Sequence, residues 1–448
     1  MDIFSGEEKI YETDEPEVSQ NSAIHGLIAT AETLTVNAVF MAFNNFVTHE
    51  SWAHPEKESI HNSFTQPWEW DEGDGFIVNH LGHPAQGSQY FVSGRINSFN
   101  FYQSYFFSAL GSFTWEVICE NHGSAMNDFI VTTTASMPFG EMLYRMYVEA
   151  YAAGVPAPLA FIINPMAGLH HLITGWQPPD YGRNMHQLKM YAGGGFSDIY
   201  SSAQGFDGNI FSFSGPFAYL GFSFIYGNPF LSESRVPYSQ FELEMSFGMD
   251  IGEYLEGRIV SDGYLFSFSP VHSNSNLMST GLSLHWDSII QGRFNKTDAT
   301  INMYNSALNW AVKYQHLFSQ DFSFQAKICS GITPMGAGTY YSTERLRDLA
   351  FYGFGMNSKI LLALEHTEFG KLETSAFSYR QWNYPGTSKL SGGNIYWLFT
   401  DLAYSYNITK NLSLGILYSF VMERGFFDNQ PDTSRTSNTA KCYIAWYW

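Results

Sequence analysis

A histidine and several carboxylates lie inside otherwise apolar stretches of the chain between residues 68 and 145. His83 is a candidate general base or metal ligand for the hydrolysis of a lipid or an envelope glycan. Its candidate partners are Glu116, Glu120 and Asp128. Hydroxyl groups that such chemistry could use are present at Ser88, Ser112 and Ser124. The sequence contains neither an HExxH nor a GxSxG motif, so the enzyme hypothesis rests on residue types alone.

Charged groups in apolar surroundings need partners, because burying an unpaired carboxylate costs several kcal/mol. Glu141 and Arg145 are four residues apart in the favourable order of acid then base, and Arg95 is a second counter-ion. Glu116 and Glu120, also four apart, would share a helix face, where their repulsion requires a nearby cation or one protonated group. We therefore expect one compact polar network drawn from several helices: Asn79, His83, Arg95, Glu116, Glu120, Asn127, Asp128, Glu141 and Arg145.

Several functions are compatible with this network. The interpretation that we favour is structural, with hydrogen bonds and ion pairs locking helices to a larger fold. One alternative is a membrane-embedded hydrolase that acts through His83 and the carboxylates. Another is binding of a lipid or glycan ligand, or transport through a pore that the helices plug or line. The sequence predicts no cofactor and no metal site.

The composition favours a membrane β-barrel. Of the 448 residues, 45% are hydrophobic, 17% are aromatic and only 14% are charged, against roughly 25% charged in a typical soluble domain. The aromatic content excludes disorder, and a mean hydropathy of -0.16 excludes a bundle of ordinary transmembrane helices. A barrel gives such an average because lipid-facing residues alternate with polar lumen-facing ones. The net charge of -20 argues against nucleic acid as a partner.

Three regions follow along the chain: a flexible acidic lead-in at 1–20, a helical domain at 21–180 and a barrel at 186–448. The helical domain holds three stretches close to the roughly 20 apolar residues that span a bilayer: Ile24–Val47, Phe101–Cys119 and Ala150–Gly175. Each is interrupted, by Glu32 and Asn37, by Glu116, or by three prolines. We therefore expect helices that plug the barrel lumen or pack on its periplasmic end, with the core of a soluble domain as the alternative.

Period-two alternation predicts the barrel. Apolar and polar residues alternate through 241–249, 322–329 and 412–420. Short turns near residues 319, 369 and 410 alternate with long polar segments at Gly336–Leu349, Tyr384–Gly393 and Asp428–Ser437. That rhythm is typical of outer-membrane barrels, and we expect about twelve antiparallel strands.

The C-terminal strand supports the same location. Ala440, Cys442, Ile444, Trp446 and Trp448 alternate with other residues and would face lipid. A terminal aromatic residue resembles the signal that the outer-membrane barrel assembly machinery reads, so this machinery and outer-membrane lipid are the expected partners. No signal peptide is visible at the start of the chain, and outer-membrane export requires one.

A longer pattern resembles an uncharacterised bacterial outer-membrane family that carries a domain of unknown function. It runs D-x-F-x-x-N-x-x-x-H-P-x-x-G-S-x-Y from Asp74 to Tyr90, with W-E-x-x-x-E, N-D and G-E beyond it. The resemblance covers about residues 24–176 and implies a helical segment before a β-rich remainder. The chain departs from the family pattern at Ser98, and at Ala135 with Ser136, where the pattern has glycines.

Overall fold

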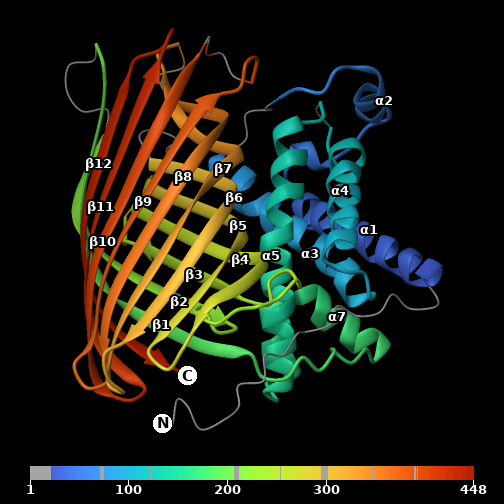
Figure 1. Ribbon diagram of the computed structural model, residues 1–448. Coiled ribbons are helices and arrows are strands. Elements are labelled where there is room, and N and C mark those ends of the chain that lie inside the picture. The colour runs from blue at the N-terminus through green and yellow to red at the C-terminus, as the bar shows by residue number, and fades with distance from the viewer. Residues whose placement is uncertain are drawn as a thin grey trace.

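The computed structural model describes residues 22–70, 75–121, 123–205, 211–252, 254–293, 301–344, 347–387, 390 and 392–448. The expected lead-in at 1–20 and Asp74 of the family pattern lie outside the described residues. The described chain has a helical part followed by a barrel (Figure 1).

Twelve antiparallel strands of the described chain form a closed barrel in which each strand pairs with its neighbours in sequence. β1 closes the barrel by pairing with β12, from Lys189 opposite Tyr447 to Ala203 opposite Thr433. The predicted strand number is therefore confirmed. The strands are β1 (Met185–Ala203), β2 (Phe211–Tyr226), β3 (Phe241–Met249), β4 (Tyr254–His272), β5 (Asn276–Arg293), β6 (Ile301–Leu317), β7 (Phe322–Ser342), β8 (Arg347–His366), β9 (Gly370–Asn383), β10 (Gly393–Thr409), β11 (Leu412–Phe427) and β12 (Thr433–Tyr447).

Contacts across the barrel show which face of each strand points inward. Arg258 on β4 reaches Asp401 on β10, on the opposite side of the barrel, with 2.7 Å between Nη1 and Oδ2. Because strand side chains alternate between faces, the neighbours of these inward residues point outward. On β3 this rule sends Glu242 inward and Phe241 and Leu243 outward, as the alternation in the sequence predicts.

The connections between strands correct part of the predicted loop pattern. Short turns join β6 to β7, β8 to β9 and β10 to β11, as expected. Of the three segments expected to be long loops, only 384–392 is one, since β7 continues to Ser342 and β12 begins at Thr433. The barrel end that holds the short turns also holds one long connection, at 227–240, which contacts the helices.

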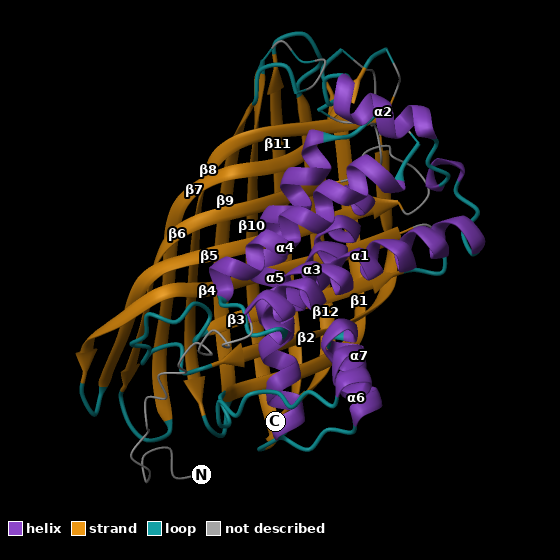
Figure 2. Cartoon of the chain, turned by 90° about the vertical axis from the view of Figure 1, so that its right-hand side faces the viewer, coloured by secondary structure: helices purple, strands orange, loops and turns teal. Residues whose placement is uncertain are grey.

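Seven α-helices of the described chain form a layer beside the barrel (Figures 1 and 2). The long helix α5 runs along the wall, with α3 against it and α1 and α4 farther out (Figure 1). Two π-helices, η2 (Val78–Gly82) and η3 (Trp115–Cys119), adjoin α3 and α4. The helices are α1 (Ser22–Phe46), α2 (Lys57–Thr65), α3 (His83–Ile96), α4 (Phe101–Thr114), α5 (Met126–Ala152), α6 (Ala157–Ile163) and α7 (Pro165–Thr174).

The helical layer packs on the outer face of the wall. Phe139 of α5 contacts Trp286, with 4.7 Å between ring centroids, and His80 contacts Tyr304 at 4.9 Å. Trp286 points outward because its neighbour Asp287 points inward to Lys359, and Tyr304 points outward because it pairs with Ser288, the other neighbour of Asp287. We expected helices that either plug the barrel or pack on its periplasmic end. The structure shows helices that pack on the barrel, but along its wall rather than at that end.

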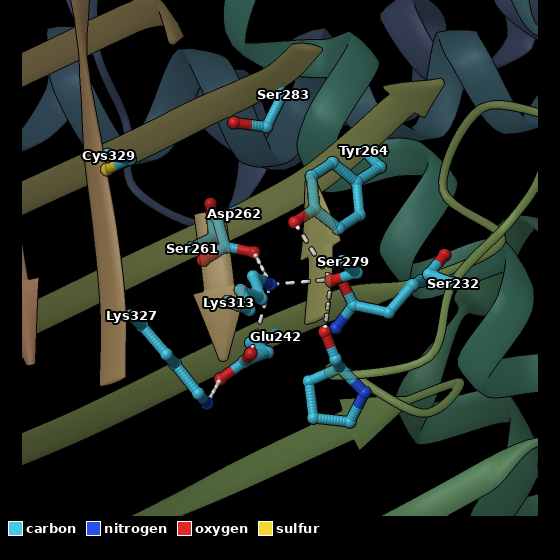
Figure 3. A network of polar contacts seen from close by, with 12 residues as sticks. Ser232, Glu242, Ser261, Asp262, Tyr264, Ser279, Ser283, Lys313, Lys327 and Cys329 are labelled. Atoms are coloured by element: carbon cyan, nitrogen blue, oxygen red, sulfur yellow. Dashed lines mark hydrogen bonds and ion pairs between the residues drawn. The ribbon is translucent and has the colours of Figure 1, made fainter. Parts of the chain in front are cut away.

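The lumen is occupied by side chains of the strands themselves. Figure 3 shows Lys313 reaching Asp262 and Glu242, and Lys327 reaching Glu242 as well. These residues line a cavity of about 100 Å³, which holds only a few water molecules. Inward apolar side chains, among them Met303 and Trp397, pack toward the other end of the barrel. This filling leaves the described helices no room in the lumen.

The Arg258–Asp401 pair should be a strong cross-link of the barrel. Arg258→Met leaves Asp401 without its cation, and we expect a loss of stability near the lower end of about 3–5 kcal/mol, because both side chains keep some exposure. The double variant Arg258→Met/Asp401→Leu should recover most of it, since no buried charge is left unpaired. The measurement is the temperature at which the folded, fast-migrating gel band disappears. A double variant no more stable than the single one contradicts the prediction.

Candidate functional site

The predicted site residues lie on η2, α3, α5 and the segment of η3 with Glu120 after it, and α3 and α5 meet at very close range. A Cβ added to Gly87 of α3 would lie 2.6 Å from the carbonyl oxygen of Thr132 in α5. A Cβ added to Gly140 of α5 would lie 2.8 Å from the ring of Phe91. Glycines at these positions allow the two backbones to approach, so polar side chains on the facing sides are buried together.

The first set of predicted residues, which we call the wall group, joins the helices to the barrel. It consists of the predicted residues Asn79, His83, Asn127 and Asp128 together with Tyr352 of the barrel, which was not predicted. Asn127 Nδ2 donates to Tyr352 Oη at 3.0 Å and to Asp128 Oδ1 at 2.9 Å, and Asn79 Nδ2 lies 3.4 Å from the same hydroxyl. His83 Nε2 lies 3.8 Å from Asp128 Oδ1. Tyr352 belongs to β8 and points outward, so these bonds run from the helical layer to the wall.

His80 lies beside the wall group and contacts the barrel through its ring. The ring is fully buried between Phe76 and Tyr304, and Nδ1 lies 3.0 Å from the carbonyl oxygen of Phe76. The aromatic contacts of the ring pack the helical layer against the wall.

Glu116 and Glu120 do not share a helix face, because the helix ends between them. Glu116 lies in η3, whereas Glu120 has an extended backbone. Glu116 Oε2 accepts a hydrogen bond from the backbone N–H of Ala125 at 2.9 Å, at the start of α5. Glu120 Oε1 accepts from Trp115 Nε1 at 2.6 Å. A local donor thus stabilises each acid, and the positive end of the α5 dipole adds to this stabilisation at Glu116.

The second set, which we call the arginine group, consists of Arg95, Glu141 and Arg145. Arg95 Nε and Arg145 Nε each lie 2.8 Å from a different oxygen of Glu141. Arg145 Nη2 also donates to the carbonyl oxygen of Pro237, in the 227–240 connection, at 2.8 Å. The guanidinium groups lie over the rings of Tyr144 and Tyr226, which stabilise the extra positive charge.

The expected single network is therefore divided. His83 and Arg95 are twelve residues apart on α3, or about 18 Å along a helix. The wall group lies near one end of α5 and the arginine group nearer the other. The expectation that all members lie close together is wrong, because the same two helices carry both groups at different heights.

The structure also places several polar residues that the analysis of the sequence did not include in the network. Tyr90 of α3 donates to Asn37 Oδ1, and Gln86 Nε2 donates to the Tyr90 hydroxyl at 2.5 Å, joining α1 to α3. His170 of α7 has Nδ1 2.5 Å from Glu32 Oε1 of α1. A polar residue that recurs inside each apolar stretch is the signal that could have identified these pairs.

The described residues offer little for a metal ion. No group of three or more His, Cys, Asp or Glu side chains among them is arranged to hold one. The thiols of Cys119 and Cys329 are free and buried. Hydrogen bonding and ion pairing are thus the chemistry that the described site shows.

Residues 67–166 match a family model. The model is that of DUF3943, a domain of unknown function. The resemblance to an uncharacterised domain is thereby confirmed over its central part. The matched segment contains the arginine group and the four helical members of the wall group, whereas Tyr352 lies outside it. No curated protein matches the chain.

Several solved barrels resemble the fold. The toluene transporter TodX of Pseudomonas putida is 10% identical, with 62% of this chain and 93% of that chain covered and a TM-score of 0.24. The toluene transporter TbuX of Ralstonia pickettii is 8% identical, over 59% and 89% of the chains, with a TM-score of 0.23. The NanC porin is 8% identical, over 56% and 98%, with a TM-score of 0.27. Scores this low carry no argument about function.

The departure from the family pattern at Ser98 has a structural consequence. Ser98 ends α3 with a φ of 67°, and Phe99 N–H donates to the carbonyl oxygen of Gly94 at 3.1 Å. This is the left-handed position after a helix where glycine is preferred. Ser98→Gly should therefore stabilise the protein by about 0.5–1 kcal/mol, whereas Ser98→Ala should give no gain. Unfolding temperatures of both variants test this, and equal temperatures contradict it.

The arginine group yields a sharper prediction. Glu141→Gln leaves two fully buried arginines without their carboxylate and should cost about 3–5 kcal/mol. The matched control is Arg183→Gln, because Arg183 pairs with buried Glu149 but is itself 60% exposed. That change should cost about 0–1 kcal/mol. Thermal unfolding of both variants is the measurement, and similar losses would show that the arginine group is not a structural centre.

Proposed function

We propose that this chain is an integral outer-membrane protein whose closed barrel anchors the DUF3943 helical layer, and that its polar groups lock that layer to the wall. The observation that carries the proposal is the pair of hydrogen bonds from Asn127 to Tyr352 and from Arg145 to Pro237. Both join a side chain of α5 to the barrel part of the chain, one at each end of the layer.

The side of the barrel away from the helices supports a membrane location. Outward residues there are large, apolar and exposed, including Met190, Leu220, Leu402, Ile416 and Trp446. Such a continuous apolar surface is costly in water and ordinary in a bilayer. With the short turns and both ends of the barrel domain on one side, that side is the periplasmic one in the usual orientation of such barrels.

The filled lumen favours an anchor over a pore. Ion pairs join strands far apart around the barrel, such as Arg258 to Asp401 and Lys359 to Asp287. Each pair crosses the path that a solute would take. A channel with a helical plug would instead have helices in the lumen, which strand side chains fill here.

The contacts of the carboxylates favour a structural role over catalysis. Glu116 accepts a backbone hydrogen bond at the start of α5, and Glu120 accepts one from Trp115. His83 and Asp128 are the remaining acid–base pair of the enzyme hypothesis, and Asp128 is itself held by Asn127. Each acid therefore positions a segment of the helical layer, as a lock requires.

Tyr352→Phe tests the lock. It removes the hydroxyl that accepts from Asn127 and leaves buried donors, which should cost about 1–3 kcal/mol at the helix–wall contact. We expect the parent chain to fractionate with the outer membrane as a heat-modifiable barrel. In the variant, protease should cut the helical layer faster while the barrel band persists.

The matched control for this experiment is Tyr406→Phe, because the Tyr406 side chain is exposed on β10. It should leave the rate of cleavage unchanged. Equal protection of the helical layer in Tyr352→Phe and in the parent chain contradicts the lock. A parent chain that stays soluble without detergent contradicts the membrane location.

A further inference from the structure

We infer that the outward face of the helical layer is a lipid-contact surface, covered by the acyl chains of the same membrane that surrounds the bare side of the barrel. The inference rests on the proposed membrane location of the barrel and adds a second, helical part to what the bilayer contacts. It also makes the wall group and the arginine group polar centres at membrane depth.

The distribution of charge in the layer is inverted relative to a soluble domain. Within the described residues 75–121 and 123–175, every Asp, Glu, Lys and Arg side chain is buried, with 5% or less of its surface exposed. These residues are Arg95, Glu116, Glu120, Asp128, Glu141, Arg145 and Glu149. In water-soluble proteins charged residues lie mostly on the surface and are fully buried almost only when paired, whereas intramembrane charges as a rule face the protein interior and pair there.

Large apolar side chains take the exposed positions instead. Phe106 of α4 is 62% exposed, Leu27 of α1 is 72% exposed, and Ile162 of α6 and Ile173 of α7 exceed 70%. Helix α1, from Ala23 to Phe46, is also the one described helix that is long and apolar enough to cross a membrane. Its single charge, Glu32, turns inward to His170.

Exposed charges resume at both margins of this apolar face. Glu50, Glu56, Lys57 and Glu58 are exposed around α2, which Figure 1 shows at the upper end of the layer. Arg183 is exposed in the segment before β1, at the other end. A charge-free band between two charged margins is the pattern that a bilayer imposes.

The position of the layer on the wall places this band at bilayer depth. The helices contact the wall from Tyr304, near the start of β6, to Tyr226 and Phe241, at the end of β2 and the start of β3. Those points lie toward opposite ends of the barrel. The layer therefore occupies the place that lipid takes around the rest of the barrel. Its outer face then meets the lipid that surrounds the layer.

Acyl chains fit this face better than a protein partner does. Protein interfaces carry about one hydrogen bond per 100–200 Å² and a polar rim. The exposed faces of α4 and α7 have no charged residue, and their exposed residues continue the apolar surface of the bare wall. A contact with a second copy or another protein remains the competing outcome of the experiment.

Spin labels at single cysteines separate these outcomes. In a Cys442→Ser background, we would label Phe106→Cys on α4 and Leu172→Cys on α7 in the full chain, reconstituted in phosphatidylcholine and phosphatidylglycerol vesicles. Collisions with oxygen report lipid, and collisions with a water-soluble nickel complex report water. The native Cys442, exposed on the outward face of β12, is the lipid control, and Gln320→Cys in the turn after β6 is the water control.

We expect the ratio of oxygen to nickel collisions at both helical positions to match that at Cys442 and to exceed that at Gln320→Cys severalfold. A ratio like that of Gln320→Cys at the helical positions, with Cys442 still in lipid, overturns the inference and leaves the barrel proposal intact. Low collision rates with both reagents mean a protein contact and also overturn it. Nickel access at Cys442 itself would instead contradict the proposed membrane barrel.

Discussion

The helical layer depends on one buried carboxylate. Glu141 holds Arg95 of α3 and Arg145 of its own helix, and Arg145 continues to the backbone of Pro237 between β2 and β3. Helices α3 and α5 and the barrel are thus connected through the Glu141 carboxylate. Two arginines and one glutamate leave a net positive charge without access to water, which aromatic rings and carbonyl oxygens must stabilise. Such an arrangement tolerates little displacement, so it fixes the height and tilt of α5 against the wall.

The barrel could be predicted from the sequence because its signal is local. Alternation such as that from Phe241 to Met249 determines which side chains point outward, whatever the strands pair with. The pairing of Arg258 with Asp401 could not be predicted, since it joins residues far apart in sequence and depends on the curvature of the whole barrel. The predicted loop lengths were wrong where polar residues continue a strand beyond the apolar band, as they do in β7 up to Ser342.

The helical segment shows a different limit. Its apolar stretches and their polar interruptions were visible, and the pairing of Glu141 with Arg145 followed from their spacing. The position of these helices relative to the barrel could not be predicted. A helix with an apolar exterior and an inward charge suits a lumen, a protein core or a bilayer equally well. Glu32 and Glu116 interrupt the apolar stretches in sequence, which argued against contact with a membrane. In the structure both side chains face protein, and a charge that faces protein does not interrupt a lipid-facing surface.

The barrel and the helical layer therefore follow the same rule by different geometries. On the strands, a period of two sends Lys313 and Glu242 into the lumen and leaves apolar residues outside. On the helices, a period near 3.6 sends Arg95 and Glu141 toward the wall and leaves Phe106 outside. The lipid contact that we propose explains both patterns, because a bilayer disfavours charge on the faces that it covers. At Tyr352 and Pro237 the two interiors touch, so polar bonds there can leave the barrel without meeting lipid.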